Sequence, residues 1–167
     1  MTTTDTPAVA VPMLGAAVEA FLFREARLID QGHLDEWFAL WSRAGLYWAP
    51  MDDDPRRGLS LFYEDWTRLR DRLTIMKSET AYPQEPRSQT VRSVTNVEFR
   101  LDPDGLVETN SALHIVERRR GQQWIHAGRV EHRLEITDDA ASPYRIRTKV
   151  VRLLGATDAL GNISFLL

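Results

Sequence analysis

No cysteine occurs among the 167 residues of this chain. Disulfide bonds, thiolate metal sites, iron–sulfur clusters with cysteine ligands and a thiol nucleophile are therefore excluded from it. The absence is compatible with a reducing compartment, and we expect a cytoplasmic protein. The sequence also lacks a glycine-rich phosphate loop, a GxSxG nucleophile elbow and an HExxH zinc motif, so the common local signatures of catalysis are missing.

Long apolar runs and a strong charge of either sign are absent as well. The opening residues, MTTTDTPAVAVP, have no basic region of the kind that begins a secretory signal, and charged residues interrupt every later apolar run. With 21 Lys and Arg against 24 Asp and Glu, the net charge is -3, too small for a general attraction to nucleic acids or membranes. We expect a loose N-terminal arm over residues 1–12, a single domain over residues 13–167, and no nucleic-acid or membrane partner.

Apolar residues at helical spacing dominate the first half of the sequence. The spacing predicts a helix over residues 13–30, whose buried stripe contains one polar residue, Glu25, among Val18, Phe21, Leu22 and Ile29. A short helix is predicted over LDEWFALWS, residues 34–42, and GLYWAPM then suggests a short strand. A third helix is predicted over residues 59–77, with a seam that steps by three and four through Phe62, Trp66, Leu69, Leu73 and Met76.

Strand-like runs fill the second half of the chain. The pattern predicts four of them, over residues 91–101, 106–118, 124–137 and 144–154. These runs exceed the usual strand length of about five to six residues. Antiparallel strands of such length curl strongly and form a concave face that helices can close. We therefore predict an α+β, cone-shaped domain, with the N-terminal helices packed on a long, strongly curved antiparallel sheet.

Alternation assigns side chains to the faces of these strands. The first strand should bury one face, formed by Val91, Val97, Phe99 and Leu101. The last strand should place Tyr144, Ile146 and Val150 opposite a basic row formed by Arg145, Arg147 and Lys149. That basic row suits acidic residues of a partner subunit and equally suits a solvated sheet face.

The two middle strands suit a hairpin with a two-residue turn at residues 120–121. This turn sets His126 opposite Ile115 and leaves His114 on the other face of the sheet. We expect the apolar face of the hairpin to pack under the helices through Trp124, Val130 and Leu134.

The four histidines, at positions 33, 114, 126 and 132, are candidates for a metal or proton-transfer site. His126 and His132 share a strand face, but six residues of extended strand separate them by roughly 20 Å. They therefore cannot share a metal ion or exchange a proton directly. Three interpretations stay open for them, namely core packing, a contact between subunits and a lone catalytic base.

Acidic residues provide two further candidates. Asp30 and Asp35 could pair with His126 as a carboxylate–imidazole base, but they equally suit a helix end and a helix cap. The run from Asp52 to Asp54 could attract a cation, yet it lacks the ligand spacing of a calcium loop and indicates a turn. We therefore predict no catalytic, cofactor-binding or metal-binding residue in this chain.

Three blocks of sequence, taken in order, resemble one family. FLFREARLIDQGHLDEWFALW with LYWAPM is similar to the opening of the β (small) subunits of aromatic-ring-hydroxylating dioxygenases. RLRDRL with PRSQTVRSVTNV resembles their central segment, and KVVRLLGATDALGNISFLL resembles their closing strand and tail. The resemblance extends from about Phe21 to Leu167. Gln89 and Val91 depart from the arginines often found there, and TIMKSETAYPQEP departs as well, which concerns the choice of partner and substrate rather than the fold.

The resemblance implies a nuclear-transport-factor-2-like cone fold and a non-catalytic, structural role. It implies assembly with a larger α subunit, commonly as three α and three β chains, with self-association through the β chains. The α chain of such oxygenases carries a Rieske 2Fe–2S cluster and a mononuclear non-haem iron, and the assembled enzyme dihydroxylates aromatic rings during their degradation. The alternatives are a stand-alone cone-fold dehydratase or isomerase and a small-ligand-binding domain.

Overall fold

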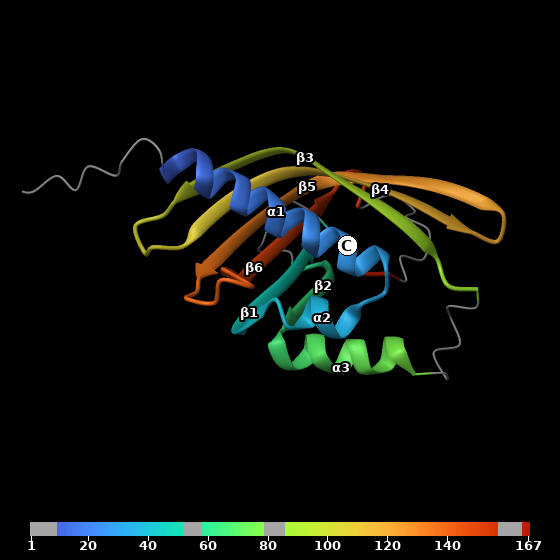
Figure 1. The fold of residues 1–167 in the computed structure, drawn as a ribbon. Helices are drawn as coiled ribbons and strands as arrows, with labels where there is room; N and C mark the ends of the chain where they lie inside the picture. The colour runs from blue at the N-terminus through green and yellow to red at the C-terminus, as the bar shows by residue number, and fades with distance from the viewer. Residues whose placement is uncertain (1–9, 52–57, 79–85, 157–164) are drawn as a thin grey trace, which may run out of the picture.

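The computed structural model describes residues 10–51, 58–78, 86–156 and 165–167. Figure 1 shows its helices and strands, which are α1 (Ala10–Asp30), α2 (Leu34–Phe38), β1 (Trp41–Pro50), β2 (Ser60–Asp65), α3 (Trp66–Lys77), β3 (Gln89–Leu101), β4 (Val107–Arg119), β5 (Gln122–Ile136) and β6 (Tyr144–Leu153). The strands form one sheet in the order β2-β1-β6-β5-β4-β3. All neighbours are antiparallel except β1 and β6, which run parallel.

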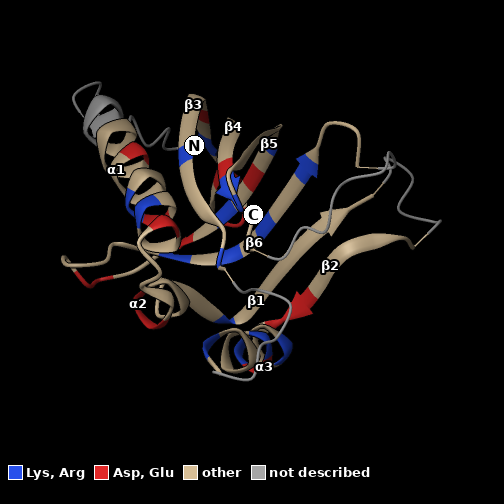
Figure 2. Cartoon of the chain, turned by 90° about the vertical axis from the view of Figure 1, so that its right-hand side faces the viewer, with Lys and Arg blue, Asp and Glu red and all other residues tan. Residues whose placement is uncertain are grey.

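The sheet is strongly curved, and α1 lies across its concave side (Figure 1). Figure 2, turned by 90°, shows the sheet bending from β3 round to β2, with α3 beside β1. The predicted α+β cone is therefore confirmed, with one parallel strand pair that the sequence pattern did not predict.

Helix α1 buries the predicted stripe, including Glu25. The helix ends in a Schellman motif, because His33 N donates to Leu28 O and Gly32 N donates to Ile29 O. Gly32 has a φ of 73°, which glycine adopts without the Cβ penalty. The helix begins at Ala10, three residues earlier than predicted, and residues 1–9 of the predicted arm lie outside the described residues.

The predicted helix over residues 59–77 is wrong in its first part. Residues 60–65 form β2, in which Phe62 and Glu64 are buried and alternate with the exposed Tyr63 and Asp65. Helix α3 starts only after Asp65, whose side chain caps it by accepting from Arg68 N at 2.9 Å. Phe62 lies four positions before Trp66, a spacing that also fits one turn of a helix. In the structure, however, the ring of Phe62 stacks on that of Tyr47 in β1. The second helix is also shorter than predicted, because β1 already begins at Trp41.

The predicted hairpin register is confirmed. His126 pairs with Ile115, and His114 lies exposed on the opposite face. Val130 and Leu134 are buried as predicted, whereas Trp124 near the hairpin turn is 42% exposed. The expectation that Trp124 packs under the helices is therefore wrong, because the hairpin extends beyond α1 (Figure 1).

Two β-bulges reassign faces that simple alternation predicted wrongly. In β3 the bulge between Thr95 and Glu98, where Asn96 has a φ of 53°, turns Val91 to the face opposite Val97 and Phe99 and leaves it exposed. Leu101 keeps the face of Phe99 but is exposed at the end of the strand. In β6 the register shifts between Ile146 and Thr148, so Lys149 points into the cone rather than along the row of Arg145 and Arg147. The alternation of side chains between the two faces, counted from one end of a strand, is reversed beyond a bulge, because the bulge inserts one extra residue.

Candidate functional site

A buried polar cluster occupies the interior of the cone. It joins Glu25 of α1, His132 of β5 and Lys149 of β6, which are 3%, 4% and 3% exposed. Lys149 Nζ donates to Glu25 Oε1 at 2.7 Å, and His132 Nε2 lies 3.2 Å from Glu25 Oε2. Trp37 Nε1 also donates to Glu25 Oε1, at 3.2 Å. Four separate elements, α1, α2, β5 and β6, are thus cross-linked through one carboxylate.

Burial and charge act against each other in this cluster. Burial by itself raises the pKa of the Glu25 carboxyl, but Lys149 and His132 outweigh it and leave that pKa well below its usual range. Burial lowers the pKa of the Lys149 ammonium, and Glu25 opposes this change. An ionised carboxylate only accepts hydrogen bonds, so Nε2 of His132 is the donor to Glu25. In the neutral ring Nδ1 then accepts from Thr109 Oγ1, which lies 3.5 Å away.

The space beside this cluster is too small for an aromatic substrate. The cavity lined by Glu25, His132 and Lys149 has a volume of about 20 Å³. That volume suits a single water molecule, which needs roughly 10–15 Å³. Ser111 lines the same cavity, and its buried Oγ has no hydrogen-bond partner within the described part of the chain. Glu25 and His132 therefore bond to each other, and the cavity beside them is too small for a reacting molecule.

His126 belongs to a second cluster, near the hairpin. Its Nε2 lies 2.9 Å from Glu117 Oε2, while Ser88 Oγ donates to Glu117 Oε1 at 2.5 Å. The imidazole packs edge-on against Phe165, with the two ring centroids 5.4 Å apart. Because the carboxylate stands between the hydroxyl and the imidazole, Ser88 is not activated by His126 as a nucleophile would be.

Asp30 belongs to a third cluster, at the mouth of the cone. Thr90 Oγ1 and Arg92 N donate to its two carboxylate oxygens at 2.9 and 2.7 Å, and the Arg92 guanidinium pairs with it. Arg92 also donates to the carbonyl of Leu166, so it ties the C-terminal segment to the sheet. Burial lowers the pKa of Arg92, and Asp30 opposes this change. A half-open cavity of about 260 Å³ borders these groups.

The structure separates the residues that the sequence offered as one site. Asp35 pairs with Lys77 at 2.6 Å on the surface, whereas Asp30 pairs with Arg92 and His126 with Glu117. The predicted alternative of a carboxylate–imidazole base among these three is therefore wrong. His33 pairs with Glu36 on the surface. The run from Asp52 to Asp54 lies outside the described residues.

The imidazoles acquire partners that sequence reasoning did not identify. His132 uses Glu25, and His126 uses Glu117, both within this chain. The single carboxylate on the apolar stripe of α1 was the available signal for the first pair. No comparable signal marked Lys149, because a bulge decides which way it points. In the described ranges, no three His, Asp or Glu side chains are grouped so that they could hold a metal ion.

These features define a class of protein: a cone-shaped α+β domain whose interior is filled by its own side chains and cross-linked by buried ion pairs. Residues 24–157 match the family model described as "Ring hydroxylating beta subunit". The chain belongs to this family, the β subunits of ring-hydroxylating dioxygenases, and its partner in the oxygenase is an α subunit. The resemblance noted in the sequence is thereby confirmed.

Individual relatives agree with this membership. The chain is 32% identical over 126 residues to the small oxygenase component of the p-cumate 2,3-dioxygenase system of Pseudomonas putida, over 72% of this chain and 70% of the relative. It is 31% identical over 139 residues to the anthranilate 1,2-dioxygenase small subunit of Acinetobacter baylyi, over 78% and 83%. The β subunit of benzoate 1,2-dioxygenase from Burkholderia mallei has a similar structure, with a TM-score of 0.75, 26% identity, and coverage of 99% and 100%. Among the described helices, none combines the length and hydropathy needed to cross a bilayer.

Proposed function

We propose that this chain is a structural subunit that stabilises an iron-bearing α subunit in a cytoplasmic oligomer of three α and three β chains. We also propose that residues 13–167 act as one domain and contribute no catalytic, cofactor-binding or metal-binding side chain. The observation that carries the proposal is the closed interior of the cone, where the Glu25–His132 pair borders only about 20 Å³ of space. A stand-alone dehydratase or isomerase would need an open pocket around such a pair.

The proposed division of labour places the redox chemistry in the partner. A Rieske 2Fe–2S cluster needs two Cys and two His ligands on one chain, and this chain has no Cys. A mononuclear iron site needs two His and a carboxylate that converge, whereas His126 and His132 bind different carboxylates. The residues present therefore fit neither group, and we assign both to the α subunit.

We propose that the substrate of the assembled enzyme is an aromatic compound undergoing degradation. The relatives named above act, by their names, on p-cumate, anthranilate and benzoate, all of which are aromatic acids. This favours a ring that bears a carboxylate. Selectivity between such rings would lie in the pocket of the α subunit, since the space beside Glu25, His132 and Lys149 is only about 20 Å³.

Co-expression with an α subunit of a ring-hydroxylating oxygenase from the same source provides the test. We expect the two chains to copurify, iron and acid-labile sulfide to follow the large subunit, and ring dihydroxylation to require both. As a control, Glu25→Gln should change the yield of the complex but not the turnover per iron-loaded complex. A chain that never binds the large subunit, or that alone converts a substrate, would contradict the proposal.

A further inference from the structure

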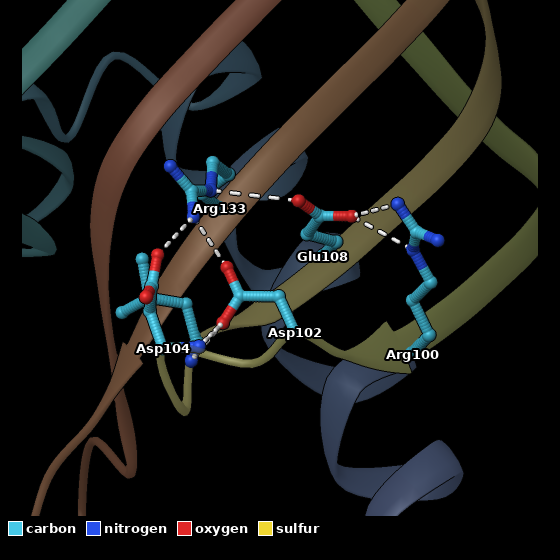
Figure 3. A network of polar contacts seen from close by, with 6 residues as sticks. Arg100, Asp102, Asp104, Glu108 and Arg133 are labelled. Carbon is cyan, nitrogen blue, oxygen red and sulfur yellow. Dashed lines mark hydrogen bonds and ion pairs between the residues drawn. The ribbon is translucent and has the colours of Figure 1, made fainter.

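Five buried polar atoms have no hydrogen-bond partner within the described part of the chain, namely Trp41 Nε1, Glu64 Oε2, Arg92 Nε, Ser111 Oγ and Arg133 Nε. Almost every buried polar group in a native protein has such a partner, so each of these atoms requires an explanation. Arg133 Nε has one, because Glu108 Oε1 faces it at 3.6 Å and Asp102 pairs with the same guanidinium (Figure 3). Arg92 and Ser111 share a different explanation, because both line one cavity.

This cavity, of about 20 Å³, lies beside the Glu25–Lys149 pair inside the cone. Arg92 of β3 and Ser111 of β4 both point inward there and are 9% and 6% exposed. An apolar occupant would leave both polar atoms unsatisfied, which costs free energy in a buried site. The volume exceeds the roughly 10–15 Å³ that one water molecule needs and is too small for anything much larger. The cavity therefore suits a small polar molecule with its own hydrogen-bond donors and acceptors.

The groups around the cavity match the hydrogen-bonding capacity of a water molecule. The guanidinium of Arg92 can only donate, and while its Nη1 donates to Asp30, its Nε is left over. Lys149 Nζ uses one of its three N–H groups for Glu25 Oε1. The Glu25 carboxylate accepts, and the Ser111 hydroxyl accepts as well as donates. Two donors and two acceptors thus face the two lone pairs and two hydrogens that water offers.

Two buried ion pairs meet at this cavity. Asp30 pairs with Arg92 and Glu25 pairs with Lys149, and both carboxylates come from α1. The pairs act on each other, because Glu25 counteracts the lowering of the Arg92 pKa by burial, while Arg92 itself lowers the pKa of Lys149. Two cations therefore line one small space. An oxygen atom placed between them would stabilise both charges.

We propose that the cavity binds one water molecule, which accepts hydrogen bonds from Arg92 and Lys149 and donates them to Ser111 and Glu25. This water joins the two buried ion pairs of α1 into one network, and Ser111 extends the network to β4. The Glu25 carboxylate opposes an anion such as chloride, and Arg92 and Lys149 oppose a cation, so the occupant is neutral. The site lies within a single chain and is independent of the subunit assembly proposed above.

A high-resolution crystal structure of the full, unmodified chain tests the site directly. We expect one peak of electron density in the cavity, at about 2.7–3.2 Å from both Ser111 Oγ and Arg92 Nε. Crystals grown in bromide should give no anomalous signal at this peak, because the site excludes halide ions. A cavity without density, a protein atom bonded to Ser111 Oγ, or a bromide signal would each overturn the proposal.

Oxygen-17 magnetic relaxation dispersion provides the test in solution, because it counts the water molecules that a protein holds for longer than its tumbling time. Ser111→Val replaces the hydroxyl by apolar groups that fill part of the cavity, so we expect one long-lived water fewer. Ser93→Val, at an exposed position on the outer face of β3, is the matched control and should leave the number unchanged. Equal numbers in the unmodified chain and in Ser111→Val would contradict the proposal. If Ser111→Val does not fold, the crystals of the unmodified chain decide the question.

Discussion

Lys149 Nζ and Glu25 Oε1 lie 2.7 Å apart inside the cone, although 124 positions separate the two residues in the sequence. The pair fastens α1 to β6, and both side chains are buried, at 3% exposure each. The attraction between two buried charges has to offset the loss of their hydration, so the pair adds little net stability. Removing one partner is a different matter, because the other charge then stays buried and unpaired.

Glu25→Ala should therefore be among the most destabilising single changes in the chain. We expect the free energy of unfolding to fall by about 3–5 kcal/mol, as measured by urea denaturation. Glu25→Leu combined with Lys149→Met should recover most of this loss, because both charges are then absent. Glu19→Ala on the exposed side of α1 is the matched control and should change stability by less than about 0.5 kcal/mol. Equal effects at the two glutamates would contradict the buried pair.

The pH dependence of stability should also depend on Glu25. Despite its burial, Lys149 and His132 lower the pKa of Glu25 in the folded chain from its ordinary value of 4.5. The folded state therefore binds fewer protons than the unfolded state below that pH, and stability decreases as the pH falls. The contribution is complete above about pH 4.5 and declines by at most ~1.4 kcal/mol per pH unit below it.

Urea titrations of the chain and of Glu25→Gln between pH 7 and pH 3 measure this contribution. The stability difference between the two proteins should be largest near neutral pH and should shrink in acid. Parallel curves over the whole range would show that the folded pKa of Glu25 is not lowered.

Asp30 and Asp35 allow a comparison of a buried and an exposed ion pair. The Arg92 side chain paired with Asp30 is 1% exposed, whereas Asp35, paired with Lys77, is 82% exposed. Asp30→Ala should cost about 3 kcal/mol, because it leaves the Arg92 guanidinium buried without its counter-ion. Asp35→Ala should cost less than about 1 kcal/mol. Thermal unfolding of both variants in parallel gives the comparison, and a reversed order would refute the assignment.

The buried imidazole of His132 should matter for folding and not for chemistry. His132→Ala removes the hydrogen bonds that its imidazole makes with Glu25 Oε2 and Thr109 Oγ1, so we expect a loss of about 1–3 kcal/mol in unfolding free energy. His114→Ala, at an exposed position on the other face, should be nearly neutral. Turnover per intact, iron-loaded complex should be unchanged in both. Abolished turnover in an intact His132→Ala complex would instead assign this residue a catalytic role.

Local sequence patterns were sufficient for the elements whose surroundings are regular. The apolar stripe of α1 repeats at helical spacing, and Gly32 follows it where a positive φ is required, so both the helix and its end could be predicted. The turn at residues 120–121 and the alternation around it determined the pairing of β4 and β5. That pairing in turn placed His114 and His126 on opposite faces.

Local patterns gave wrong predictions in two situations. In one, an extra residue in a strand changes which face the following side chains take. In the other, the spacing of apolar residues fits a helix although the segment is a strand. Phe62 stands four positions before Trp66, which suits a helix, but the cap at Asp65 begins α3 only afterwards. The bulges in β3 and β6 reverse the faces predicted for Val91 and Lys149. A bulge depends on how neighbouring strands twist and pair, and this information is distributed over the whole sheet.

By itself, the sequence determined the helix-then-strand order, the family, and the absence of cysteine that keeps iron–sulfur chemistry off this chain. The separation of His126 and His132 also followed from it, since strand spacing alone keeps them apart. Only the tertiary structure decided their partners. Glu25, His132 and Lys149 meet because the curved sheet brings β5 and β6 under α1, and such a meeting depends on contacts between residues more than one hundred positions apart.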